Sequence, residues 1–370
     1  MKKLFTKIIA VAVSTAAVLS LTGCGSVSYN YDKTSTKYEV SKELSDPNAS
    51  ENTKRLYSFL CDIYGEKILS GQVCDDGVNG GEMTVIKDTT GVYPAILSMD
   101  FMEYSPGRPD GGVNGKTIEY GIEWWEMGGI LEYHWHWITD SRYTRDGKNW
   151  YSTFYTDSTT FNLEKALNGS DNYGHAMLLQ GIEAIAAQIQ ILADRDIPIL
   201  FRPLHEASGG WFWWGASGKD AYIELYRLMY DQLTNYYGLH NIIWVWNGQD
   251  EDWYPGDEYV DIVSYDSYPG KQIYTSQKKL FDMTQAVPAS AKPVYMSENG
   301  CVFDPDLAVS DDAMWGCFIT WQGEFIEKTV VGAAVLSEEY NEEYMLKKVY
   351  ESDRVLTLDE LPDLEKYSIK

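Results

Sequence analysis

The chain has 370 residues, with 30 Lys and Arg against 55 Asp and Glu, so its formal net charge is −25 at pH 7. This acidity excludes a general binder of nucleic acid or of anionic membrane surfaces, because both are negatively charged and would repel it. The composition, 44% hydrophobic and 23% charged, is that of a folded globular protein and argues against wholesale disorder.

The N-terminal segment is typical of an exported protein. Residues 1–7 carry three lysines, and residues 8–21 form an apolar run interrupted only by serine and threonine. A membrane span needs about 20 apolar residues, so this shorter run fits the core of a signal peptide. It ends in Leu-Thr-Gly-Cys at residues 21–24, which resembles the lipobox of bacterial lipoproteins. The resemblance predicts a signal peptide over 1–23 and a lipid anchor on Cys24, at the extracellular face of a bacterial cell membrane. The alternative is an ordinary secretory peptide with a chance cysteine.

The segment that follows the predicted anchor is polar. Residues 24–50 are rich in Ser, Tyr, Asp, Asn and Thr, and we expect them to form a flexible tether. Loss of three lysines with the signal peptide would take the charge from −25 to −28. The four later cysteines are too few for a disulfide framework, and their redox state stays open at this point. They are Cys61, Cys74, Cys301 and Cys317.

From residue 51 the chain alternates short, nearly continuous apolar runs with helical patterns. Such runs are typical of strands that are buried on both faces of a parallel sheet. Eight strands are predicted, at residues 67–72, 94–100, 128–137, 198–206, 241–247, 260–268, 292–300 and 331–340. Helical patterns are clearest at 175–195, 219–237 and 311–328. This alternation predicts an α/β fold, a single (β/α)8 TIM barrel over 51–355, with a C-terminal tail over 356–370.

Polar side chains stand at or near the ends of the predicted strands. In α/β barrels the active site lies at the carboxyl ends of the strands, so we expect these side chains to share one barrel mouth. They are Gln72, Asp100, His136, Arg202, His205, Glu206, Asn247, Asp266, Tyr268, Glu298 and Glu338. Such a ring of hydrogen-bonding and carboxylate groups indicates catalysis or ligand binding.

Two of these residues suit the cleavage of a glycosidic bond. Glu206 ends the fourth predicted strand and Glu298 the seventh. Glycoside cleavage needs one carboxyl group that is protonated, to assist the leaving oxygen, and one that is ionised, to attack the sugar or to activate water. Glutamates on nearby barrel strands can face each other at about 5 Å, the spacing of retaining enzymes. An ionised neighbour would raise the pKa of the acid and keep it protonated. Taken alone, either glutamate would be interpreted as an ordinary solvated or ion-paired residue.

The surrounding motifs resemble glycoside hydrolase family 26, in which mannanases predominate. The resemblance rests on Phe-Arg-Pro-Leu-His-Glu-Ala-Ser-Gly-Gly-Trp-Phe-Trp-Trp-Gly at 201–215, and on segments 241–247, 254–263 and 292–298. It covers roughly residues 51 to 350 in the order of the family. It implies an eight-stranded α/β barrel and a retaining mechanism, with Glu206 as the acid/base and Glu298 as the nucleophile. It implies no metal and no cofactor.

The resemblance also assigns roles to neighbours of the two glutamates. It places Arg202 and His205 near the sugar in the −1 subsite, and it matches Trp211 with a tryptophan that packs on the substrate. Tyr268 matches a tyrosine that hydrogen-bonds the nucleophile. The implied substrate-binding residues are His136, Arg202, His205, Trp211, Asp266 and Tyr268.

A regular fourth strand could not present all of these groups at once. Side chains alternate along a strand, so Arg202 and Glu206 would point to one side and His205 to the other. We therefore expect the strand end to bulge or turn, as strand ends near active sites often do. Trp213 and Trp214, in the same segment, could equally contact the substrate or pack in the core.

Two other classes of function are considered. His134 and His136 form a His-x-His pair like those of metal-dependent hydrolases, but a catalytic zinc wants three protein ligands. The remaining histidines stand in helical or loop contexts, apart from His205. A surface glycan-binding lipoprotein without catalysis would suit the anchor and the many aromatic residues. Retention of both glutamates disfavours that alternative.

The expected function is endo-acting hydrolysis of β-1,4-mannosidic bonds in mannan or glucomannan. His205 stands where a contact with the 2-hydroxyl, which is axial in mannose, would be expected. The same fold and mechanism acting on mixed-linkage β-glucan or β-xylan stays open. The expected partner is thus a neutral β-linked polysaccharide, and the protein is expected to be a monomer that meets the membrane only through its lipid.

Overall fold

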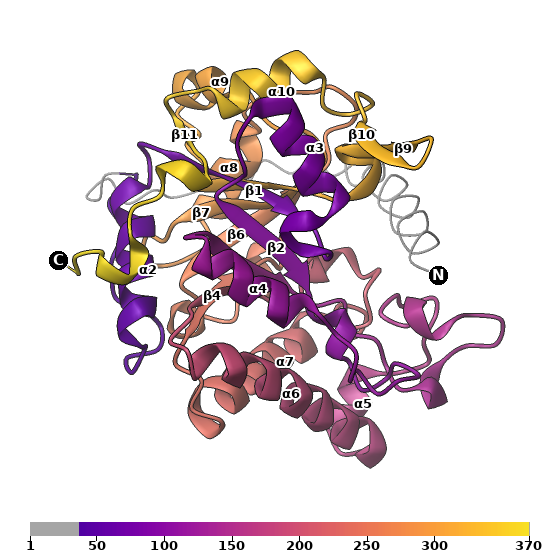
Figure 1. Cartoon of the computed structure of the whole chain (residues 1–370). Coiled ribbons are helices and arrows are strands. Elements are labelled where there is room, and N and C mark those ends of the chain that lie inside the picture. The colour runs from indigo at the N-terminus through magenta and orange to yellow at the C-terminus, as the bar shows by residue number, and fades with distance from the viewer. Residues whose placement is uncertain (1–36, 370) are drawn as a thin grey trace.

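Eight short apolar runs form the strands of a closed parallel barrel in the computed structural model, which describes residues 37–369 (Figure 1). All strand residues are buried except the half-buried Tyr265, as expected when side chains fill the inside and helices cover the outside. Each strand pairs with the next, and β8 closes the barrel on β1. The strands are β1 (Ile68–Val73), β2 (Ile96–Asp100), β3 (Ile130–His134), β4 (Ile199–Arg202), β5 (Ile242–Trp246), β6 (Ile262–Ser267), β7 (Val294–Asn299) and β8 (Cys317–Thr320).

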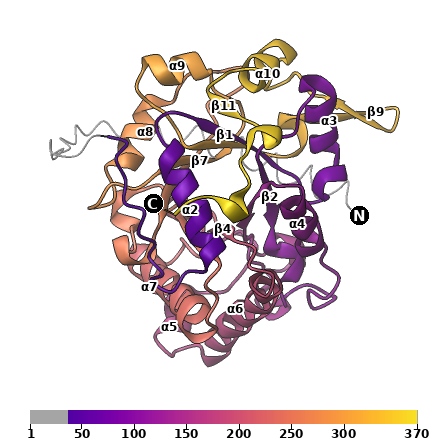
Figure 2. The same ribbon diagram turned by 60° about the vertical axis from the view of Figure 1, so that its left-hand side comes forward.

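Helices surround the barrel, as Figures 1 and 2 show from two directions. They are α2 (Glu51–Ile63), α3 (Gly81–Thr90), α4 (Thr117–Glu126), α5 (Leu163–Leu167), α6 (Asn172–Ala193), α7 (Lys219–Tyr230), α8 (Lys278–Gln285), α9 (Pro305–Ser310) and α10 (Glu343–Tyr350). Side chains cap several of them: Ser50 accepts the N–H of Thr53 in α2, and Asp171 accepts the N–H of Gly174 in α6.

Within residues 37–369, α6 alone is long and apolar enough to suit a membrane span, but nine of its residues, mostly aliphatic, are buried in this fold. The fold class is thus the predicted (β/α)8 barrel.

The prediction of the eighth strand was wrong. β8 lies within 311–328, which was predicted as a helix, whereas 331–336 belongs to an exposed antiparallel hairpin of β9 (Glu327–Val330) and β10 (Ala333–Leu336). Figures 1 and 2 show this hairpin projecting from the barrel. A four-residue strand between other apolar residues cannot be distinguished from a buried helix by periodicity. Consequently Glu338 does not end a barrel strand: it is exposed, and its backbone carbonyl accepts a hydrogen bond from Gln272, in the loop after β6.

Residues 37–50, predicted as part of a flexible tether, are packed against the domain. The ring of Tyr38 lies 5.2 Å from that of Tyr64, just before β1, and its hydroxyl donates to Asp312, just before β8. Asp46 and Ala49 are also buried. This segment therefore covers the end of the barrel where the strands begin, because its aromatic and carboxylate groups find partners there. Residues 24–36 and Cys24 lie outside the described residues.

The C-terminal residues also pack on the barrel. β11 (Val355–Leu356) pairs in parallel with the first residues of β1. Beyond it, the Tyr367 ring lies 5.3 Å from that of Phe59 in α2, and Arg55 donates to the carbonyl of Tyr367 at 2.6 Å.

The four cysteines whose redox state the sequence left open are free thiols, and all of them are buried. Burial raises the pKa of Cys61 to about 12, which makes this thiol a poor nucleophile. These cysteines therefore act as small packing residues.

Candidate active site

Glu206 is presented by an irregular turn after β4. The strand ends at Arg202, and both Leu204 and Glu206 then adopt left-handed backbone angles, with φ of 53° and 54°. Such angles are uncommon for residues other than glycine and are found where surrounding contacts impose them. Here the N–H of Glu206 donates to the backbone carbonyl of Asn247, at 2.7 Å, and to its side-chain oxygen, at 3.1 Å. The turn expected at this strand end is therefore present.

Glu298 faces Glu206 from β7. The pairing of β6 with β7 shifts register between Tyr265 and Asp266, so that Asp266 lies beside Glu298. One carboxylate oxygen from each of Glu206, Asp266 and Glu298 lies within 4.8 Å of the others. Tyr268 donates a short hydrogen bond to Glu298. Three carboxyl groups therefore converge at one barrel mouth.

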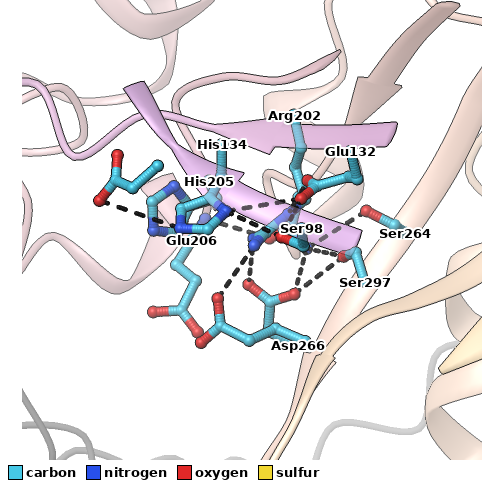
Figure 3. A network of polar contacts seen from close by, with 12 residues as sticks. Ser98, Glu132, His134, Arg202, His205, Glu206, Ser264, Asp266 and Ser297 are labelled. Carbon is cyan, nitrogen blue, oxygen red and sulfur yellow. Dashed lines mark hydrogen bonds and ion pairs between the residues drawn. The ribbon is translucent and has the colours of Figure 1, made fainter. Parts of the chain in front are cut away.

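Arg202 links the carboxylates of this acidic cluster (Figure 3). Its guanidinium donates to three carboxylates: Nε to Glu132 at 3.1 Å, Nη1 to Asp266 at 2.9 Å and Nη2 to Glu298 at 3.0 Å. The arginine is fully buried, so these interactions are little screened by solvent. Burial would lower the pKa of Arg202, but Asp266, Glu132 and Glu298 raise it above its usual range. Arg202 is therefore a permanent buried cation that orients Glu298.

The surroundings of Glu206 favour its protonated form. Burial, Asp266 and Glu298 raise the pKa of the Glu206 carboxyl well above its usual range, although hydrogen bonding from Trp211 opposes them. The indole N–H of Trp211 donates to one oxygen at 2.9 Å, and the amide of Gln249 donates to the other at 3.4 Å. Burial and Glu298 likewise outweigh Arg202 and raise the pKa of Asp266 to about 7. A carboxyl that stays protonated near neutral pH is what proton donation to a leaving group requires.

Histidines line the other side of the cluster. His136 Nδ1 lies 2.7 Å from a carboxylate oxygen of Asp100, and His136 Nε2 lies 3.3 Å from His205 Nε2. His205 is only 1% exposed, with the rings of Phe212 and Trp214 packed around it at 5.0 and 5.6 Å. Burial lowers the pKa of His205 well below its usual range, and His136 contributes, so the ring is neutral. His136 is buried to nearly the same extent, at 3% exposed.

The tryptophans of the 211–214 segment divide into two groups. Trp213 and Trp214 are buried, and their indoles donate to the backbone carbonyls of Trp137, at 2.6 Å, and His205, at 2.8 Å. They are core residues that shape the cleft wall. Trp211 is half-buried and touches Glu206, so it alone of the three stands at the cleft.

Among residues 37–369, two groups of side chains have the proximity that metal ligands need: Asp100 with His134 and His136, and the three carboxylates. Their other interactions do not suit a metal. In the first group Asp100 and His136 hydrogen-bond each other, and Asp100 and Glu132 raise the pKa of His134 against the effect of burial, which favours a proton on that ring. In the second, Arg202 already supplies the positive charge.

The model of the family described as glycosyl hydrolase family 26 matches residues 45–350. The chain belongs to this family. It is 40% identical to a mannan endo-1,4-beta-mannosidase of Thermothelomyces thermophilus over 331 residues, which are 88% of this chain and 64% of that protein. It is 28% identical to a mannan endo-1,4-beta-mannosidase of Bacillus subtilis strain 168, covering 82% of this chain and 87% of that one. The family 26 chain thus spans only 51 to 64% of the length of the first three curated relatives.

Solved structures of similar proteins have the same fold. A Podospora anserina GH26-CBM35 β-(1,4)-mannanase superposes with a TM-score of 0.81 at 35% identity, over 90% of this chain and 72% of that one. A β-mannanase from a symbiotic protist of the termite Reticulitermes speratus, solved with a gluco-manno-oligosaccharide, gives 0.74 at 30% identity, over 88% of this chain and 99% of that one.

Sequence reasoning missed two residues of this family 26 site. Glu132 bonds Arg202 from the middle of β3, and a lone acid inside an apolar strand run was the signal that could have found it. Trp321 follows β8 directly, and its ring lies 5.4 Å from His134 and 5.8 Å from His136. It was missed because the eighth strand was misplaced.

Proposed function

We propose that this protein is an endo-acting, retaining glycoside hydrolase that cleaves β-1,4-mannosidic bonds in mannan or glucomannan. The observation that carries the proposal is the pair of carboxyl groups within 4.8 Å, one held protonated by its surroundings and the other held by Arg202 and Tyr268. Inverting enzymes hold their two carboxyl groups about 6.5–9.5 Å apart, to make room for a water molecule. The shorter separation favours direct attack on the sugar.

The proposed mechanism has two displacements. In the first, Glu206 gives its proton to the glycosidic oxygen while Glu298 attacks the anomeric carbon, so that the leaving chain departs and a glycosyl-enzyme forms. In the second, Glu206 removes a proton from water, which attacks the same carbon and releases Glu298. Arg202 and Tyr268 orient the nucleophile, and Trp211 orients the acid. The acid/base role of Glu206 follows from its raised pKa.

The choice of mannan as substrate rests on the relatives, several of which are called mannan endo-1,4-beta-mannosidases. Mannose differs from glucose in its axial 2-hydroxyl, so discrimination requires a polar group directed at that position. His205, which immediately precedes Glu206 and whose buried Nδ1 has no partner among residues 37–369, is suitably placed to supply one. A site built around such a bond rejects an analogue that leaves its polar group unpaired.

The substrate is tested by a reducing-sugar assay on linear mannan, glucomannan, xylan and mixed-linkage glucan, using purified residues 24–370. We expect mannan or glucomannan to be cleaved at least tenfold faster than the other two, as the buried polar groups near the 2-hydroxyl require. Faster cleavage of xylan or mixed-linkage glucan would overturn the substrate while leaving the mechanism standing. A protein that binds mannan without cleaving it would overturn the enzymatic proposal.

The protein is also proposed to be a lipoprotein anchored through Cys24 at the outer face of the cell membrane. The positions of the first described residues support an orientation in which the cleft faces away from the membrane. Lys37 and Tyr38 lie where β1 and β8 begin, near Tyr64 and Asp312, whereas the catalytic carboxyl groups lie where the strands end. A chain anchored before residue 37 would therefore hold the base of the barrel toward the membrane and leave the cleft open to polysaccharide.

Replacing Cys24 by serine is expected to abolish lipidation, because only a thiol can take the thioether-linked lipid. Mannanase activity should then appear in the culture medium or remain with an unprocessed precursor, as measured by fractionation and by mass spectrometry of the N-terminus. Cys61→Ser serves as the matched control and should stay on the membrane. A wild-type protein that is freely secreted with an unlipidated N-terminus would rule out the anchor.

A further inference from the structure

Asp100, at the end of β2, is held in a single orientation by three donors. One of its carboxylate oxygens accepts the backbone N–H of Met102 at 2.8 Å and that of His136 at 3.0 Å. The other oxygen lies 2.7 Å from Nδ1 of His136. Burial would raise the pKa of Asp100, but His136 and His134 lower it to about 2, so the carboxylate is ionised and can only accept hydrogen bonds. The Nδ1 atom of His136 must therefore carry a proton.

The position of the proton on His136 also determines which nitrogen of His205 is protonated. Nε2 of His136 and Nε2 of His205 face each other at 3.3 Å, and one shared proton is needed for them to bond. A neutral imidazole has one donor and one acceptor nitrogen. In the neutral form of His136 that carries its proton on Nδ1, Nε2 is the acceptor. His205 must then carry its proton on Nε2, which leaves its buried Nδ1 as an acceptor without a partner among residues 37–369.

We propose that Asp100 is a positioning residue that sets the tautomers of both His136 and His205, and thereby decides which sugar hydroxyls the −1 side of the cleft can bind. The inference rests on the proposed hydrolase function, since the two rings border the catalytic cluster. Asp100 itself contacts no reacting atom and acts through His136. Reversing both tautomers would exchange donors for acceptors along the pair without moving an atom of the carboxyl cluster.

The test is Asp100→Asn. The asparagine keeps an oxygen for the two backbone N–H groups but turns an NH₂ donor toward His136 Nδ1, which then has to become an acceptor. In a serine-protease triad the same change leaves the geometry intact and lowers kcat about 10⁴-fold through the wrong tautomer. Here the histidines bind the sugar rather than transfer its proton, so we expect a fall in kcat on linear mannan of about a hundredfold, with KM changed less than threefold.

The matched control is Asp261→Asn. Asp261 is also buried and also accepts two backbone N–H groups, from Ser45 at 2.6 Å and Trp244 at 2.8 Å, but it lies just before β6, at the far end of the barrel from the cleft. This variant should lose thermal stability and keep its kcat. An equal loss of kcat in both variants would reduce Asp100 to a structural residue and overturn the proposal.

A second measurement separates this inference from the proposed function. The chain has five histidines, so the ring ¹⁵N shifts of His136 and His205 can be assigned by single substitutions. In the unliganded wild type we expect protonation at Nδ1 of His136 and at Nε2 of His205, and the reverse in Asp100→Asn. Any other wild-type tautomers, or tautomers that the substitution leaves unchanged, would refute the inference even if mannan is cleaved. A wild type that cleaves no mannan would refute the function while the tautomer assignment still stood.

Discussion

Glu298→Ala is expected to abolish hydrolysis of both mannan and aryl mannosides, with kcat reduced by more than about 10⁴-fold, because no glycosyl-enzyme can form without the nucleophile. Glu206→Ala should lose activity on mannan but retain the first step on substrates whose leaving groups need no proton, such as dinitrophenyl glycosides. Azide should rescue its second step by replacing the water that Glu206 activates. Steady-state and burst kinetics on both substrates distinguish the two variants.

The pH profile gives an independent measure of Glu206. This carboxyl acts as an acid only while protonated, so its raised pKa predicts activity that persists toward neutral pH and falls as the pH passes that pKa. The alkaline fall should be absent in Glu206→Ala acting on activated substrates. Glu82→Gln, a buried glutamate on α3 that accepts the N–H of Gly323, is the control and should keep the wild-type profile. Proton NMR showing inversion at the anomeric carbon of the first product would contradict the double displacement.

Arg202→Met is expected to have the largest effect on stability. The substitution would leave Glu132, Asp266 and Glu298 buried without their shared cation, and breaking a buried ion pair in this way costs about 3–5 kcal/mol of unfolding free energy. Urea unfolding measures this loss. Catalysis should be lost as well, because Glu298 would no longer be held.

The loss of stability in Arg202→Met should depend on pH. Without the arginine, the pKa values of the three carboxyl groups in the folded state should rise above those in the unfolded chain. Stability would then be retained at acid pH and lost as the pH rises above about 4. Arg227→Met is the control, because that guanidinium donates to the backbone carbonyl of Pro255. A loss for Arg202→Met that is equal at pH 5 and pH 8 would show that the carboxyl groups find other partners.

The barrel and the meeting of Glu206 with Glu298 could be predicted from sequence because both depend on local patterns. Seven of the eight predicted strands overlap strands of the barrel, since an apolar run between helical patterns has few alternatives in an α/β fold. Glu206 and Glu298 followed from their places at strand ends, because the carboxyl ends of parallel barrel strands must meet. The turn at Glu206 was also predictable, since a regular strand cannot point His205 and Glu206 the same way.

Only the tertiary structure decided which residues are buried and which charged groups pair, because both depend on neighbours that are distant in the sequence. The apolar residues of 331–335 look like a buried strand, yet they form an exposed hairpin, while the four residues of β8 are buried because β1 and β7 lie on either side. The three partners of Arg202 come from positions 70, 64 and 96 residues away, and no local pattern encodes pairings at such separations. His205 is covered by His136, Phe212 and Trp214, so its role depends on packing between loops. Periodicity reports which side of an element is apolar, whereas burial and charge pairing are set by the neighbours that the fold brings together.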